Sequence, residues 1–341
     1  VDSRLSAHSL LNGAVASPQA SRLPDMSLHP PLAATAIAQG GPFTTAQALA
    51  AGYEERELAR LVRSKAWTRL RRGVLIESNH IPDDDAGRSI VMLRGLRLRA
   101  RGPIIASHRT AAAIHHLATL DPSTDLLDVT RPGSGLGRVE AGVRWRSAAL
   151  PASHLVRVAG VSCTAVARTV IDNVREADFA GGLVVAESAL NLGLTTLPVL
   201  REVHEFCLDW RGARNAGCVV SFASPLSESP GETLARIAFA EQGLPDPEQQ
   251  RYIRDAGGVI GRVDFLWKDQ RTIGEFDGKV KYTNSDNRFS LYDEKRREDR
   301  LRDVGFEVVR FGWSDVLGRP EWVARQVRAA FVRGARSSRA S

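Results

Sequence analysis

The carboxylates best placed for chemistry lie in two short strand-like runs in the last third of the chain. Asp264 stands in Arg262–Trp267 (RVDFLW), and Glu275 and Asp277 stand in Thr272–Asp277 (TIGEFD). If these runs form a hairpin about the turn between them, Asp264 lies opposite Glu275, and the same register pairs apolar residues on either side. Side chains alternate along a strand, so the three carboxylates share one face and repel each other unless a cation compensates. Oxygen ligands suit Mg²⁺ or Mn²⁺, so the pattern predicts a metal site, with an exposed hairpin in water as the alternative.

Two lysines follow these acids. Lys279 and Lys281 come directly after the second run and return to the same face if the strand continues. An ammonium beside a carboxylate-held metal stabilises the charge that develops when a phosphodiester is attacked, or positions the attacking water. The residue types therefore favour phosphodiester hydrolysis.

A further carboxylate, Glu232, lies upstream. It stands three residues after Ser229, with Pro230 between them, ahead of an apolar run. This spacing is a capping box with proline at the first helical position, which is a complete structural reason for the glutamate. A role in binding metal or positioning water is the alternative hypothesis for Glu232.

The elements around these acids form an α/β (mixed) pattern. A helix from residue 230 precedes the strand-like runs, and a charged helix over 291–304, a strand over 306–311 and a helix over 320–331 follow. The order α-β-β-(β)-α-β-α is that of a restriction-endonuclease-like core. The segments SPGETLAR, RVDFLW, GEFDGKVKY and DEKRREDRLRDVGFEVVRF resemble, in order, the very-short-patch-repair-like endonuclease domain of unknown function, a branch of the PD-(D/E)XK superfamily.

That resemblance covers about residues 226–331 and implies roles for particular residues. Asp264 matches the first acid of the superfamily, Glu275 the second, and Glu232 the glutamate often supplied by the first helix. Asp277 stands where the superfamily has its lysine, so the resemblance assigns that role to Lys281 or Lys279. It implies a Mg²⁺-dependent deoxyribonuclease, and hydrolysis of RNA is a further hypothesis because the metal chemistry does not select the sugar.

The first third of the chain predicts a DNA-binding module. Helices are expected over 32–39, 45–51 and 54–65, followed by strands over 67–70 and 73–76 that form a basic hairpin. This is a winged helix-turn-helix plan, in which the third helix enters the major groove and the wing contacts phosphate. A solvated helix whose glutamates offset its arginines is the alternative. The basic residues expected at duplex DNA are Arg56, Arg60, Arg63, Lys65, Arg69, Arg71 and Arg72.

Three segments here resemble AbiEi-type antitoxin and regulator proteins. They are GPFTTAQALAAG, LARLVRSKAWTRLRRGVLI and, at residues 106–117, ASHRTAAAIHHL; GVSCTAVARTVID at 160–172 resembles a segment that follows that domain. The resemblance implies a transcriptional regulator or antitoxin, with a cognate toxin as a candidate protein partner. The function hypotheses are thus a nuclease targeted by a winged helix or, alternatively, a regulator whose nuclease fold is non-catalytic.

Length and composition set the domain plan. The 341 residues exceed one ordinary core, and the net charge of +7 favours polyanionic partners. We expect a disordered leader over 1–31 (with Met26 as an alternative start), a winged helix-turn-helix over 32–80, a mixed α/β domain over 81–225, the nuclease domain over 226–334 and a tail over 335–341. Three dispersed cysteines suit a reducing cytoplasm, and no apolar run approaches the roughly 18 residues of a membrane helix, so a cytoplasmic protein is expected. The histidines at 108, 115 and 116 are expected to be structural.

Overall fold

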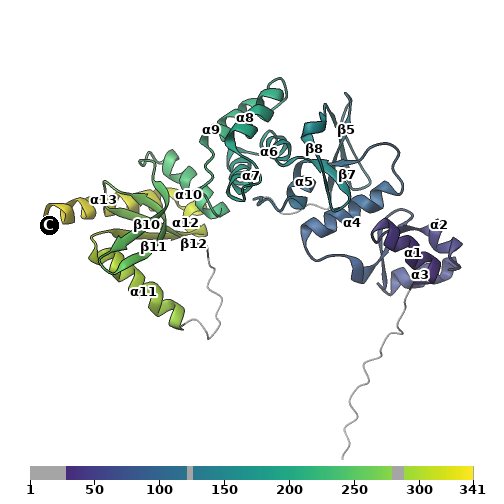
Figure 1. Ribbon diagram of the computed structural model, residues 1–341, viewed down its shortest axis with the longest axis horizontal. Helices are drawn as coiled ribbons and strands as arrows, with labels where there is room; N and C mark the ends of the chain where they lie inside the picture. Colours follow the sequence, from purple (N-terminus) through teal and green to yellow (C-terminus); the bar gives the residue numbers. More distant parts are fainter. Residues whose placement is uncertain (1–27, 121–125, 279–287, 341) are drawn as a thin grey trace, which may run out of the picture.

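The computed structural model describes residues 28–120, 126–278 and 288–340. The described chain is a mixed α/β protein with three sheets, which follow one another along its long axis from the N-terminal to the C-terminal part (Figure 1). In this part of the chain, no helix is both long and apolar enough to cross a membrane.

The N-terminal module, residues 28–77, is built of helices over a small sheet of order β1-β3-β2. Thr44 ends the first strand and caps the second helix, since its hydroxyl accepts from Gln47 N at 3.1 Å and the Gln47 side chain accepts from Thr44 N at 2.7 Å. Leu32, Phe43 and Trp67 form its core. The elements are α1 (Pro30–Gln39), β1 (Phe43–Thr44), α2 (Thr45–Ala50), α3 (Glu55–Arg63), β2 (Trp67–Arg71) and β3 (Val74–Glu77).

The helices and the hairpin of this module lie where the sequence predicts them. Two details were not expected. The strand β1 was missed because two residues are too short to show alternation. Leu28, four residues before the expected start of the module at 32, is buried in the core, and His29 stacks on Tyr53 with ring centroids 4.0 Å apart.

The middle domain has a mixed sheet of order β6-β7-β5-β4-β9-β8, with helices packed beside it. Its strands are β4 (Ile105–Ala106), β5 (Leu127–Pro132), β6 (Arg138–Glu140), β7 (Val143–Ala148), β8 (Leu155–Val158) and β9 (Val161–Thr164). Its helices are α4 (Asp85–Arg97), α5 (His108–Ile114), α6 (Val166–Val174), α7 (Phe179–Asn191), α8 (Leu197–Phe206) and α9 (Ala213–Phe222). Ala165 is the N-cap of α6, and the Thr164 hydroxyl bonds the Thr169 hydroxyl at 2.6 Å.

The elements expected in the C-terminal domain are present, together with a strand over Glu248–Asp255 and a short helix over Trp313–Gly318 that were not expected. Its sheet has the order β10-β11-β12-β13, with only β12 and β13 parallel. Leu266 pairs with Ile273, as the hairpin register requires. The elements are α10 (Pro230–Glu241), β10 (Glu248–Asp255), β11 (Gly258–Trp267), β12 (Thr272–Asp277), α11 (Arg288–Asp303), β13 (Glu307–Gly312), α12 (Trp313–Gly318) and α13 (Pro320–Ala340), the last of which includes most of the expected tail.

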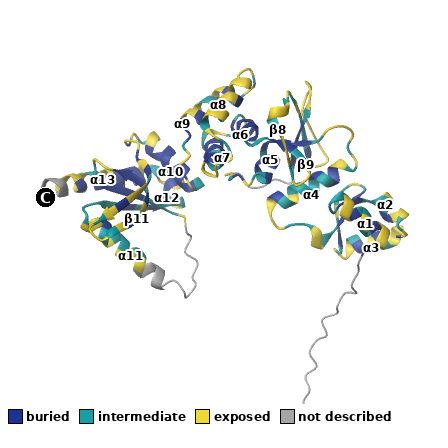
Figure 2. Ribbon diagram, in the orientation of Figure 1, coloured by how far each residue is buried: buried dark blue, intermediate teal, exposed yellow. Residues whose placement is uncertain are grey.

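The hydrophobic core continues from the middle domain into the C-terminal domain. Side chains of α6, α7 and α9 belong to the same buried cluster as Phe239 of α10 and Phe265 of β11, and α6, α7 and α10 are largely buried in Figure 2. The carboxylate of Glu187 in α7 is fully buried at this junction, where it is ion-paired with Arg236 of α10 and accepts from Thr233 Oγ1 at 2.8 Å. The two domains therefore share one interior.

Candidate functional site

The acids of the C-terminal domain meet where β11 and β12 separate. The ladder between these strands ends at the pair Phe265 and Gly274, one residue before Asp264 and Glu275. Beyond it, the carboxylate of Asp264 accepts from the backbone N–H of Phe276 at 2.9 Å. Burial raises the pKa of the Asp264 carboxyl, and the nearby charge of Glu275 raises it further. Asp264 and Glu275 are thus electrostatic neighbours.

Glu232 reaches the same region from the first turn of α10. Ser229 caps this helix by accepting from Glu232 N at 3.2 Å, as the sequence predicts. The Glu232 carboxylate is 7% exposed and accepts from Ser229 Oγ at 2.8 Å, Glu228 N at 3.0 Å and Gln250 Nε2 at 2.9 Å. Burial raises its pKa, and the charge of Asp264 adds to this. These bonds account for Glu232 as a residue that stabilises the start of α10. The carboxylate also lies within electrostatic range of Asp264.

Two arginines that sequence reasoning missed compensate Glu275. Arg297 of α11 lies 2.7 Å from Glu275 Oε1, and Arg310 of β13 lies 3.4 Å from Oε2. The run containing Arg297 was predicted as a charged helix, and this side chain turns inward over the sheet, where its guanidinium also donates to the Arg262 carbonyl at 2.7 Å. A guanidinium is thus the cation that faces Glu275 in this conformation.

The expected three-acid metal centre stays a prediction. Across residues 28–120, 126–278 and 288–340, no group of three or more His, Cys, Asp or Glu side chains is placed to hold a metal ion. Asp277 ends β12 opposite Gly312. Lys279 and Lys281 lie outside the described residues. The donor chemistry of Asp264 and Glu275 fits a hard divalent cation, provided that Glu275 exchanges its arginines for it.

The N-terminal module presents a basic surface. Arg56, Arg60 and Arg63 follow one another at i, i+4 and i+7 along α3, which places them on one side of the helix, opposite the buried Leu58 and Leu61. Arg60 lies 3.6 Å from Glu57 in an exposed ion pair, which contributes little stability.

The hairpin extends this surface. Arg69 and Arg72 are exposed, as is Lys65 just before β2, whereas Arg71 is half-buried and burial lowers the pKa of its guanidinium. Of the seven basic residues expected at DNA, Arg71 is thus the one least available to a phosphate.

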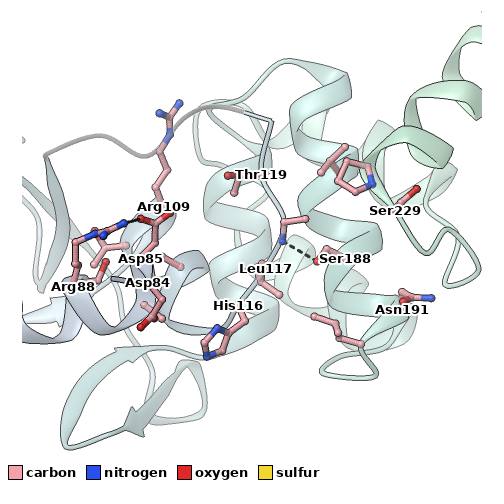
Figure 3. Close-up of a pocket in the computed structure, with 18 of the residues that line it drawn as sticks. Asp84, Asp85, Arg88, Arg109, His116, Leu117, Thr119, Ser188, Asn191 and Ser229 are labelled. Carbon is pink, nitrogen blue, oxygen red and sulfur yellow. Dashed lines mark hydrogen bonds and ion pairs between the residues drawn. The ribbon is translucent and has the colours of Figure 1, made fainter. Parts of the chain in front are cut away.

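Residues of the middle domain line two cavities. One, of about 890 Å³, lies between α4, α5, α7 and the start of α10 (Figure 3). Arg109 and His116 line it from the α5 side and Ser188 and Asn191 from α7, and Ser188 Oγ accepts from Ala118 N at 2.9 Å. His115 is not among the residues that line this cavity, and its Nε2 lies 2.8 Å from the carbonyl oxygen of Thr164.

Comparison with known proteins bears on the N-terminal module. Residues 31–76 match the family described as "Transcriptional regulator, AbiEi antitoxin". The match runs from α1 through β3 and so covers the helices and the basic hairpin. The resemblance of the AbiEi-like module seen in the sequence is confirmed over these residues.

Longer similarity is to proteins that have no assigned function. Two uncharacterized proteins of Mycobacterium tuberculosis, MT2308 of strain CDC 1551 / Oshkosh and Rv2248 of strain H37Rv, are each 27% identical to this chain over 229 residues. The aligned part covers 66% of this chain and 80% of theirs. The similarity therefore extends well beyond the AbiEi-like module.

Proposed function

We propose that the protein is a DNA-binding transcriptional regulator of the AbiEi antitoxin type, and that its N-terminal module acts as a winged helix-turn-helix. The observation that carries this proposal is the family match over residues 31–76, which coincides with the basic face of α3 and the hairpin. A cognate toxin is the protein partner that the same family description suggests.

We propose distinct tasks for four of the basic residues from their positions. In helix-turn-helix proteins the N-terminal residues of the recognition helix contact base edges. Arg56, in the first turn of α3, is therefore the residue proposed to read sequence. Arg63, Arg69 and Arg72, at the end of α3 and on the hairpin, are proposed to contact phosphate.

Selection of binding sites from a random duplex library tests this function. The full chain should enrich one sequence motif, and Arg56→Ala should relax the preference at a base position, by about 1–3 kcal/mol of discrimination. Arg138→Ala, which removes an exposed arginine from the middle domain, is the matched control and should leave the motif unchanged. Enrichment of no motif by the wild-type chain would contradict sequence-specific binding.

Nuclease activity is the second candidate function. It is favoured by the electrostatic contact among Glu232, Asp264 and Glu275 at one end of the C-terminal sheet. Asp264 and Glu275 are proposed to hold a divalent cation, which when bound would supply Lewis-acid activation of water. Glu232 is proposed to orient the surrounding polar groups through its three accepted hydrogen bonds.

Incubation of the full chain with plasmid DNA, linear DNA and RNA, with and without Mg²⁺ or Mn²⁺, distinguishes the two functions. Cleavage that needs the metal would support the nuclease. Sequence-specific binding without cleavage of any substrate would leave the regulator as the function of the whole chain.

A further inference from the structure

A second cavity, of about 620 Å³, lies within the middle domain between the sheet and the helices α6 and α7. We call it the arginine pocket. Its volume falls in the range typical of small-molecule sites. Five arginines and two carboxylates are among the side chains that line it. The charged residues of the arginine pocket are Arg109, Arg144, Arg146, Arg175, Arg211, Asp128 and Glu176.

One side of the arginine pocket is a pair of neighbouring strands. Asp128 of β5 stands in register with Arg144 of the parallel strand β7, and Arg146 follows two residues later on the same face. Asp128 Oδ1 lies 3.4 Å from Arg144 Nη1 and 3.1 Å from Arg146 Nη2. The Asp128 side chain is 1% exposed, so it fixes both guanidiniums from beneath.

The opposite side of the arginine pocket also bonds Arg146. Glu176, just after α6, accepts from Arg146 Nη2 at 2.8 Å and lies 3.4 Å from His108 Nε2. Burial alone would raise the pKa of Glu176, but His108 and Arg146 lower it to about 2. His108 is itself held with a φ of 48° beside Ser107 Oγ, which is 3.0 Å from its Nδ1. Arg146 is therefore held from both sides before any ligand arrives.

Several buried polar atoms of these residues have no hydrogen-bond partner in the described part of the chain. They are Asp128 Oδ2, Arg146 Nε and Arg175 Nε. Leaving such atoms unpaired in a protein interior costs about 1–3 kcal/mol each. By contrast, the fully buried Arg168 nearby bonds Asp172 at 2.9 Å and the Ala149 carbonyl at 3.0 Å. The three unpaired atoms are covered by the protein in this conformation, so a ligand would bind through the accessible guanidinium groups of Arg144 and Arg211.

We propose that the arginine pocket binds a small organic phosphate, such as a sugar phosphate or a mononucleotide. The excess of arginines over carboxylates favours a ligand with two negative charges over a monocarboxylate. Guanidinium groups present paired N–H donors that match phosphate oxygens. The exposed Arg211 and the partly exposed Arg144 are the side chains proposed to contact the phosphate.

Isothermal titration calorimetry of the full chain tests this assignment, with ribose 5-phosphate, AMP and inorganic pyrophosphate as probes. At least one probe should bind saturably, and Arg144→Ala and Arg211→Ala should each weaken it roughly ten- to a hundredfold, as expected for hydrogen bonds to a charged group. Both variants leave Arg146 to pair with Asp128, so the fold should be retained. Arg138→Ala, on the neighbouring strand but outside the pocket, should bind like the wild type.

Three results would overturn the proposal. They are saturable binding of none of the probes, affinities that are unchanged in both pocket variants, and displacement of the bound probe by short duplex DNA. The last would show that the same arginines belong to a DNA-binding surface.

Discussion

Salt dependence offers a quantitative test of the basic surface on the N-terminal module. The perturbation replaces four basic residues by alanine, chosen because each is exposed and lies at the end of α3 or on the hairpin. Arg60 is left in place because it pairs with Glu57, and Arg71 because it is half-buried. The replaced residues are Arg63, Lys65, Arg69 and Arg72.

The expected effect follows from counterion release. Each phosphate contact contributes about 0.9 to the slope of log affinity against log salt concentration, so losing four contacts should flatten the slope by about 3.6. Between about 50 and 200 mM salt, the wild type should therefore lose roughly 150-fold more affinity than the variant. Fluorescence anisotropy with a labelled duplex, titrated at several salt concentrations, measures both slopes.

A control variant removes the same number of positive charges from the middle domain. It separates phosphate contact from a general loss of net charge, and its slope should stay near that of the wild type. An unchanged slope in the N-terminal variant, or an equal change in the control, would refute the assignment of this surface to DNA. The control replaces the exposed residues Arg138, Arg157, Arg201 and Arg214.

Three further outcomes are expected. Glu275→Gln should abolish any Mg²⁺-dependent cleavage while metal-free DNA affinity stays similar, and retained cleavage would exclude this carboxylate as a ligand. Gly212→Ala should lower the free energy of unfolding, measured by urea titration, by about 2–5 kcal/mol, because the residue has a φ of 84° and its Cβ would lie 2.0 Å from the Arg175 carbonyl oxygen. The control Gly193→Ala, at a φ of 66° with no atom within 4 Å of the added Cβ, should lower it by only about 1–2 kcal/mol. The pKa of Glu176 falls from 4.5 to about 2 on folding, so the stability that its carboxylate contributes is full above pH 4.5 and is lost as pH falls towards 2. Glu176→Gln should therefore destabilise the protein more at pH 5 than at pH 3. An equal loss of unfolding free energy at both pH values would contradict the ion pairs.

Local patterns in the sequence were enough to place the helices and the hairpin of the N-terminal module and the β11–β12 hairpin of the C-terminal domain. The apolar pairing of Leu266 with Ile273 depends on residues close in the chain, and it is present in the fold. The two-residue strand β1 carries too little pattern to be seen.

The surroundings of the candidate sites were less accessible to sequence reasoning. Glu275 meets Arg297 and Arg310 only because α11 folds back over the sheet, and no spacing in the chain indicates that approach. The arginine pocket is likewise assembled from β5, β7 and the end of α6, whose charged residues are dispersed along the chain. Contacts between distant segments depend on packing, which a single sequence does not display.

The buried pair of Glu187 and Arg236 has a consequence for how the chain can be divided. The segment between α9 and α10 is bonded on both sides, since Ser224 N donates to Glu187 at 2.9 Å and Ser224 Oγ donates to Gln249 at 2.8 Å. A protease acting on the native protein should therefore spare this segment. It should cut more readily in the partly exposed connection between β3 and α4, residues 78–84, and so release the N-terminal module alone. Genetic recombination at residue 225 would separate the buried Glu187 carboxylate from its partners Arg236 and Thr233. The middle and C-terminal domains are therefore expected to be inherited together.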